Sequence, residues 1–255
     1  MSEPNPYGSE AAKLNRQAEW KNSMGSTSIL TIGTDLEEQF APFQATDEKL
    51  GSAGLYYFFW EVGPRRYETW TDWRDAFKLR QGHCADARFV AEDQPPNVAY
   101  SAQKQAIDFE GMMQETAIHA GQIWDCAQQI GIPQEFILYA DRRETPPVED
   151  FNQQLEIFME NTYPESDAYK WAYLYFVDRK RLIYPRQRYV DLCMKARIAE
   201  PYILAHGKLI SASSLPHIQQ EQSPLRQWDM WLDFSFEFVD QLPYDSLITK
   251  VFLKQ

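Results

Sequence analysis

Glycine, cysteine and long apolar runs are scarce in this chain of 255 residues. Eleven glycines are too few for a turn-rich all-β sandwich, and their scarcity favours helices. No segment approaches the roughly 18 consecutive apolar residues that a membrane-spanning helix needs. The first residues, MSEPNPYGSEAAKLNRQAEW, lack the basic-then-apolar layout of a signal peptide. We therefore expect a protein that neither spans nor binds a membrane.

The cysteines indicate the redox compartment of the protein. Cys84, Cys126 and Cys193 are widely spaced, and an odd number cannot pair completely. Buried, inert thiols in a reducing compartment are the simplest interpretation. The expected location is the cytoplasm, or a particle assembled there.

Sequence motifs that identify a known chemistry are also absent. Neither the GxGxxG nor the GxxxxGK[ST] phosphate loop occurs, and there is no GxSxG, HExxH or Cys-x-x-Cys. We accordingly expect no cofactor and no metal ion.

The composition is that of a folded, acidic protein. Hydrophobic residues make up 44% of the chain and aromatic residues 15%, which excludes low-hydrophobicity disorder for most of it. The net charge is −12. Nucleic acids and anionic membranes attract proteins through a broad positive field, so a nucleic-acid partner is not expected.

Apolar periodicity and turn residues predict an α+β fold that is mainly helical, with a small aromatic-rich sheet in the first half packed with a helical second half. Strands are expected at 28–33, 54–62 and 135–140, and the chain closes with a short strand or tail around LITKVFL. Helices are expected at 71–82, 98–130, 148–161, 166–180, 186–205 and 223–242. Residues 230–240 also alternate as a strand would, although Ser223-Pro224 and Pro243 favour a helix.

The predicted organisation has three parts. Residues 1–27 form a polar N-terminal arm, residues 28–147 an α+β region around the long helix 98–130, and residues 148–255 a helical region. Pro146-Pro147 is the best candidate for a hinge, and the two larger regions could also form one continuous domain.

Positive charge is concentrated in residues 178–197, DRKRLIYPRQRYVDLCMKAR, which we call the basic segment. It holds seven Arg or Lys residues against two Asp, a net charge of +5, so the rest of the chain carries −17. A docking site for phosphate or nucleic acid would use Arg179, Lys180, Arg181, Arg186 and Arg188.

Helix geometry favours a structural role for the same cations. At 100° per residue, Tyr189, Leu192 and Cys193 share an apolar stripe with Arg or Lys on both flanks. Residues 144–167, directly before the basic segment, contain seven acids and no base. This pairing predicts neutralisation within the chain or complementary patches between subunits.

Two arginine doublets in predicted loops are further candidates for ligand contacts, namely Arg65-Arg66 and Arg142-Arg143. Arginine can clamp a phosphate or carboxylate with two hydrogen bonds. Each doublet is followed by Glu68 or Glu144, which also permits a local ion pair.

Candidate catalytic residues form two small groups. His83, Cys84 and Asp86 include a thiol nucleophile and a base, but neighbours in sequence rarely point at each other as proton transfer requires. Glu115 and His119 lie four residues apart on the predicted long helix and could share a face. A loop histidine beside a buried cysteine and a helix-surface pair are the simpler interpretations.

The leading functional expectation is a non-catalytic structural or interaction subunit of a larger protein assembly. A virus or phage particle component and an adaptor or immunity-type binding protein both fit, with other protein subunits or further copies of the chain as partners. The alternatives are an enzyme of unrecognised type that uses one of the two candidate groups, and a nucleic-acid or phospho-ligand binder that uses the basic segment.

Overall fold

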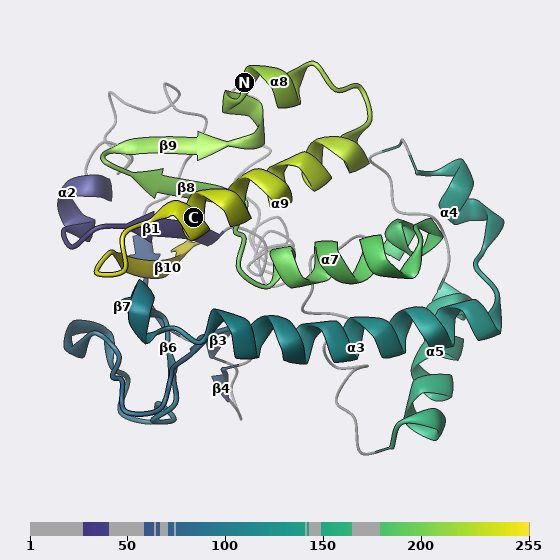
Figure 1. Cartoon of the computed structure of the whole chain (residues 1–255), viewed down its shortest axis with the longest axis horizontal. Helices are drawn as coiled ribbons and strands as arrows, with labels where there is room; N and C mark the ends of the chain where they lie inside the picture. The colour runs from purple at the N-terminus through teal and green to yellow at the C-terminus, as the bar shows by residue number, and fades with distance from the viewer. Residues whose placement is uncertain are drawn as a thin grey trace, which may run out of the picture.

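A computed structural model describes residues 28–40, 59–63, 65–66, 71–73, 75–140, 142, 149–164 and 179–254. The predicted arm 1–27 and the hinge Pro146-Pro147 lie outside these residues. Figure 1 shows a mixed sheet at one side of the molecule and a layer of helices that extends away from it.

The main sheet has six strands that are far apart in the sequence. They are β1 (Ser28–Ile32), β2 (Phe59–Glu61), β7 (Ser101–Gln103), β8 (Tyr202–Ala205), β9 (Lys208–Ser211) and β10 (Leu247–Lys254). The strand order is β2-β10-β1-β8-β9, and β7 also pairs with β10. Only β1 and β8 run parallel; the other pairs are antiparallel. The α+β prediction is confirmed, and the sheet takes as many strands from the second half of the chain as from the first.

Two small strand pairs and several short helices complete the first half. The pairs are β3 (Arg65–Arg66) with β4 (Thr71–Asp72), and β5 (Phe77–Lys78) with β6 (Val98–Ala99). The short helices are α2 (Leu36–Phe40), η2 (Ala87–Phe89) and η3 (Lys104–Ala106). The helix expected at 71–82 is therefore wrong, because residues 77–78 pair with 98–99 as strands instead.

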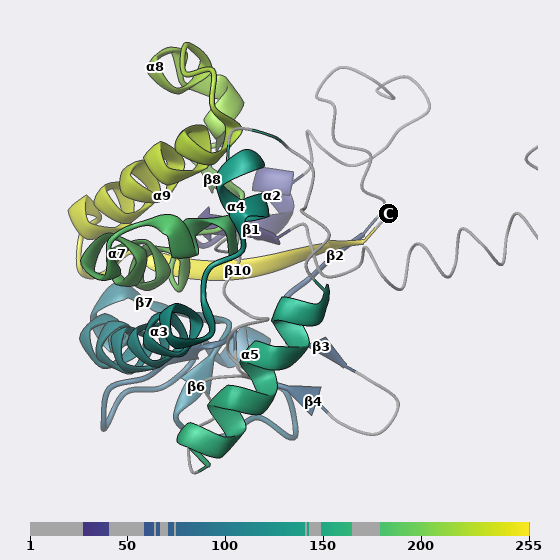
Figure 2. The same cartoon turned by 90° about the vertical axis from the view of Figure 1, so that its right-hand side faces the viewer.

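The remaining helices lie between residue 109 and the C-terminus. They are α3 (Phe109–Ile130), α4 (Gln134–Leu138), α5 (Glu149–Thr162), η4 (Arg179–Ile183), α7 (Arg186–Ala196), η5 (Ala212–Ser214), α8 (Pro216–Gln219) and α9 (Pro224–Gln241). Helices α9, α7 and α3 lie one below another in Figure 1, and Figure 2 shows α7 and α3 nearly end-on and α9 obliquely above them. The helix predictions for 148–161 and 223–242 are confirmed to within a residue or two at each end.

The long helix begins later than its periodicity predicts. Helix α3 starts at Phe109, and residues 98–103 of the expected helix 98–130 form β6 and β7. Asp108 is the N-cap, since its side chain accepts a hydrogen bond from the backbone N–H of Gly111 at 3.1 Å. The C-terminal end is as predicted, with Gly131 at a positive φ of 101°.

Two other predicted elements change type. Residues 135–140 were expected to form a strand, but α4 occupies 134–138 because Phe136 packs edge-on against Phe151 of α5. The helix expected over 186–205 ends at Ala196, and residues 202–205 become β8 after Pro201. Arg179 and Lys180, expected at the end of a helix 166–180, lie in η4; the rest of that helix falls outside the described residues.

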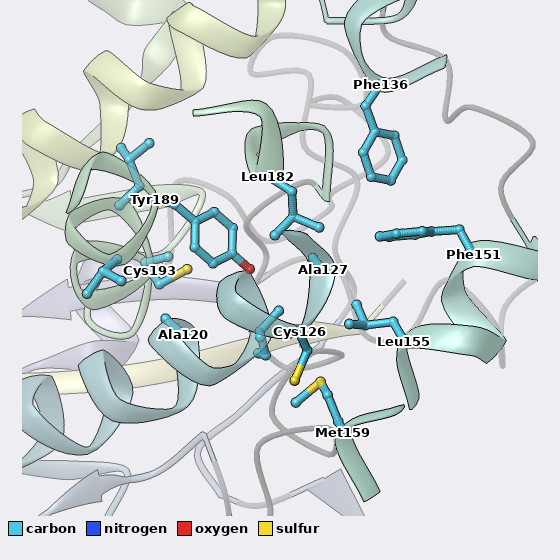
Figure 3. Packing of buried hydrophobic residues seen from close by; sticks show 14 of the residues in the cluster. Ala120, Cys126, Ala127, Phe136, Phe151, Leu155, Met159, Leu182, Tyr189 and Cys193 are labelled. Atoms are coloured by element: carbon cyan, nitrogen blue, oxygen red, sulfur yellow. The ribbon is translucent and has the colours of Figure 1, made fainter. Parts of the chain in front are cut away.

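One apolar cluster joins the helices. Ala120, Cys126 and Ala127 of α3 face Leu155 and Met159 of α5 and the buried side of α7 (Figure 3). A second cluster lies between α9 and the sheet, centred on the fully buried Trp231. Helix α7 therefore packs against α3 on one side and α9 on the other, which places the basic segment in the middle of the helical layer.

Candidate functional site

The basic segment folds as η4 followed by α7, with Pro185 at the N-cap of α7. Tyr189, Leu192 and Cys193 are buried, as the predicted apolar stripe requires. Two hydrogen bonds from α3 hold the turn before α7. Trp124 Nε1 donates to the carbonyl of Tyr184 at 3.0 Å, and Gln128 Nε2 donates to the carbonyl of Leu182 at 3.2 Å.

Arg181 is the most deeply buried cation, with 1% of its side chain exposed. Its Nε donates to Oδ1 of Asp229 on α9 at 2.6 Å, and its guanidinium also donates to the carbonyl of Leu225 at 3.1 Å. The hydroxyl of Tyr184 donates to Oδ2 of Asp229 at 2.9 Å. Burial raises the pKa of Tyr184 to about 12, and the neighbouring carboxylate of Asp229 acts in the same direction. This network replaces the hydration of the guanidinium inside the protein.

The two cations before Arg181 also face inward. Arg179 donates to the side-chain oxygen of Asn152 on α5. Burial lowers the pKa of Arg179, and the nearby charge of Glu156 opposes that shift. Lys180, which is buried, donates from Nζ to the carbonyl of Arg142 at 2.6 Å. The first two residues of η4 are therefore bonded to α5 and to the backbone of Arg142.

The cations of α7 reach both neighbouring helices. On one flank Arg186 holds Asp125 of α3 through two hydrogen bonds, at 2.9 and 3.0 Å. On the other flank Arg188 and Lys195 share Asp191 of α7 and Asp233 of α9, at 2.7 to 3.3 Å. The predicted placement of cations on both sides of the stripe is confirmed, and each side pairs with a different helix.

Arg197 completes the set at the end of α7. Its guanidinium donates to the backbone carbonyls of Asp75 and Ala76 at 3.3 and 2.7 Å. All seven cations of the basic segment thus have partners within the chain. Four of the seven cations pair with aspartates of α3, α7 or α9. Of the acidic stretch 144–167 the structure describes residues 149–164, where Asn152 accepts from Arg179 and the charge of Glu156 lies near that arginine.

The structure describes the arginine doublets in part. Arg65 and Arg66 form β3, of which the structure describes the backbone pairing with Asp72 and Thr71. The guanidinium of Arg142 lies 4.8 Å from the ring centre of Tyr139. Arg143 falls outside the described residues.

The first group of candidate catalytic residues lies in and beside a loop. His83 and Cys84 are exposed there, so the expectation that Cys84 is buried is wrong. Asp86 instead caps η2 and binds Arg88, whose guanidinium lies 2.6 Å from Oδ2. These contacts lower the pKa of Asp86, which keeps it ionised as a capping group. A carboxylate used in this way is a weak candidate for a base that activates Cys84.

In the second group, one member takes part in an ion pair. Glu115 on α3 binds Lys78 of β5 at 2.7 Å. His119 lies one turn further along α3 and is half-buried. Among the described residues, no three His, Cys, Asp or Glu side chains are placed to hold a metal ion together.

The sequence patterns did not predict one buried ion pair. Lys250 of β10 binds Glu200 at 2.8 Å, with 3% and 7% of the two side chains exposed. Ser28 of β1 donates to the same carboxylate, and the ammonium of Lys250 lies 5.1 Å from the ring centre of Phe77. The single lysine inside the apolar strand LITKVFL was the available signal, because such a lysine needs a buried partner.

Comparison with known proteins gives no relative for this arrangement: no protein family, curated protein or solved structure matches the chain. Within the part of the chain that the structure describes, no helix combines the length and the apolar character needed to cross a membrane.

Proposed function

We propose that the chain is a non-catalytic structural or interaction subunit of a larger protein assembly. A component of a virus or phage particle and an adaptor or immunity-type binding protein are the two forms of this role that its size and acidity suit.

The observation that supports the proposal is that the cations of the basic segment are paired inside the chain, whereas several large apolar side chains are exposed. The cations that looked most suited to binding a ligand hold α7 between α3 and α9. By contrast, six large apolar side chains of the described residues are exposed to solvent, and two of them lie on the short helix α4. Ile137 and Leu138 are neighbours on α4 and are 55% and 59% exposed. Adjacent exposed aliphatic side chains are typical of contact surfaces.

The local sequence explains this exposure. Helix α4 is five residues long and buries only Phe136 against the core. Successive side chains of a helix point about 100° apart, so Ile137 and Leu138 do not share the direction of Phe136. A partner that covers them would recover the free energy of burying apolar area.

Purification of the chain from its natural source under gentle conditions tests the proposal. We expect other protein subunits to accompany it in fixed proportion, identified by mass spectrometry, and the same ratio after a second independent purification step. Recovery of the chain alone as a 29.9 kDa monomer, at its natural concentration, would overturn the proposal.

A further inference from the structure

The strand β10 lies inside the main sheet, where its apolar pattern does not decide its register. One edge of β10 pairs with β1, and the other edge pairs with β2 and β7. Figure 2 shows β10 as a long strand with β1 and β8 on one side of it and β7 on the other. Residues 247–251 are all buried, so both faces of the strand are covered. In a half-exposed strand a slip of one residue would turn apolar side chains into water, but this penalty does not apply to a strand that is covered on both faces.

The backbone ladders of β10 do not select a register either. Thr249 lies opposite Thr31 of β1 and also opposite Ser101 of β7. A slip of two residues would re-form each ladder with other residues, because every residue of β10 supplies the same N–H and C=O groups. Selection must therefore come from side chains, or from the connection 242–246 that joins β10 to α9.

Two polar side chains in the middle of β10 have partners on opposite faces of the sheet, because successive residues of a strand point in opposite directions. On one face the hydroxyl of Thr249 lies 2.7 Å from that of Ser101. On the other face Lys250 binds the carboxylate of Glu200 at 2.8 Å, with 3% and 7% of the two side chains exposed. Only the second contact joins charged groups, so its loss inside the protein is the more costly of the two.

The position of the Glu200 carboxylate is fixed by neighbours of β10. Glu200 stands shortly before β8, and its backbone carbonyl accepts a hydrogen bond from Nε1 of Trp231 on α9 at 2.8 Å. Ser28 of β1 donates to the carboxylate itself. Lys250 meets this carboxylate in the register that places Lys250 opposite Leu30.

A slip of β10 in either direction would separate the ion pair. A slip of two residues would place an apolar residue, Ile248 or Phe252, opposite Leu30. A slip of one residue would carry the ammonium of Lys250 to the other face of the sheet. In both cases the carboxylate of Glu200 would stay buried without its cation, and an uncompensated buried charge is strongly destabilising.

We propose that the ion pair between Lys250 and Glu200 fixes the register of β10 in the main sheet. The pair acts by excluding slipped arrangements rather than by adding net stability, because the attraction between two buried charges often does no more than offset the cost of taking them out of water. Lys250 is therefore a residue that specifies one arrangement of the strand among several with similar apolar burial. This role does not depend on whether the chain is an interaction subunit.

Disulfide cross-linking between β1 and β10 tests the proposal in the full chain. The native reporter, Ile32→Cys with Ile248→Cys, joins residues that lie opposite each other. The N–H of Gly33 donates to the carbonyl of Leu247, so the pair beside them is a non-hydrogen-bonded pair, in which side chains are closest. The slipped reporter, Leu30→Cys with Ile248→Cys, joins residues that face each other only after a slip of two residues. In the native register they are diagonal neighbours about 7–8 Å apart, which is too far for a disulfide.

Each reporter is placed in three backgrounds, all with Cys84→Ser to remove the exposed thiol. The first background keeps the ion pair. The second, Lys250→Met with Glu200→Gln, removes both charges and keeps an acceptor for the hydrogen bond from β1. The third, Arg181→Met with Asp229→Leu, is the matched control, because it removes a buried ion pair of the helical layer and leaves the sheet unaltered. A cooperative urea transition shows that each protein is folded, and mass spectrometry identifies the cross-linked peptides.

With the ion pair present, oxidation should join the native reporter and leave the slipped reporter reduced. In the charge-free background, cross-linking of the slipped reporter should rise at least about tenfold, because a slip no longer leaves a buried charge without a partner. The control background should give the same result as the first.

Four results would overturn the proposal. The slipped reporter could cross-link as readily with the ion pair as without it, or it could rise equally in the control. It could also stay reduced in every background, which would show that the connection 242–246 or apolar packing sets the register. Failure of the charge-free variant to fold would show that the pair supplies stability instead. None of these results bears on the proposed function, whose test is the co-purification of other subunits.

Discussion

Loss of the Asp229 carboxylate is the most informative perturbation of the basic segment. In Asp229→Ala the guanidinium of Arg181 stays buried with only the carbonyl of Leu225 as a partner, and the hydroxyl of Tyr184 loses its acceptor. Removing one member of a buried ion pair costs about 3–5 kcal/mol, because the remaining charge is left without compensation. We expect a loss of this size in the free energy of unfolding.

The exposed pair on the other flank is the matched control. Arg186 donates two hydrogen bonds to Asp125, at 2.9 and 3.0 Å, and 51% and 36% of the two side chains are exposed. Asp125→Ala should therefore cost only about 0–1 kcal/mol. The comparison sets the cost of leaving buried polar groups without a partner against the cost of breaking an exposed pair.

Urea denaturation followed by tryptophan fluorescence measures both variants, and similar m-values would permit a direct comparison. A third variant, Arg181→Met with Asp229→Leu, removes both charges and should recover about 2 kcal/mol or more relative to Asp229→Ala. The reasoning is refuted if Asp229→Ala and Asp125→Ala cost the same, or if the double variant is no more stable than Asp229→Ala.

Three further predictions concern the surroundings of the same core. In thiol labelling of the native chain, Cys84 should react at once, whereas Cys126 and Cys193 should react only on unfolding. Both are buried, and burial raises the pKa of each thiol, that of Cys193 to about 12. Fast labelling of more than one thiol would contradict this prediction. The free energy of unfolding should fall as pH rises from about 10 to 12, because the pKa of Tyr184 is raised to about 12 in the folded state and Tyr184 ionises more readily once unfolded. Tyr184→Phe should flatten this part of the pH profile. An unchanged slope in that variant would contradict the prediction. Asp108→Ala should lower the free energy of unfolding by about 1 kcal/mol, because it removes the N-cap of α3. Urea denaturation measures this loss, and an effect below the error of the fit would show that the cap is unimportant.

Local patterns predicted α7 well because its burial is decided by one face of one helix. The stripe through Tyr189, Leu192 and Cys193 and the cations on its two flanks follow from residue spacing alone. The partners of those cations do not, because Asp125 and Asp229 are 61 and 48 residues away from the arginines that they bind. A single sequence contains no signal for which distant aspartate a given arginine will meet.

The same limit explains the wrong elements. Residues 98–103 have small and apolar side chains that fit a helix, but Ser101 lies opposite Thr249 of β10, and their hydroxyls are 2.7 Å apart. Long-range pairing therefore overrode local preference. In residues 135–140 a short apolar run is compatible with a strand or a helix, and the packing of Phe136 decides between them.

The candidate catalytic groups stay predictions, and the structure adds the contacts that two of their members make. Residues adjacent in sequence, such as His83, Cys84 and Asp86, need a shared pocket to act together, and only the fold can supply one. Asp86 is used for capping and Glu115 for an ion pair with Lys78, roles that spacing alone could not reveal.

The size of the chain in its natural setting tests the central claim most directly. Sedimentation velocity on a fresh native extract, with the chain detected by antibody, can be compared with the purified chain in the same buffer. An interaction subunit should sediment in the extract as a complex larger than 29.9 kDa, and the Ile137→Ser with Leu138→Ser variant should shift toward the mass of the free chain. A free 29.9 kDa monomer in both samples would contradict the proposed function.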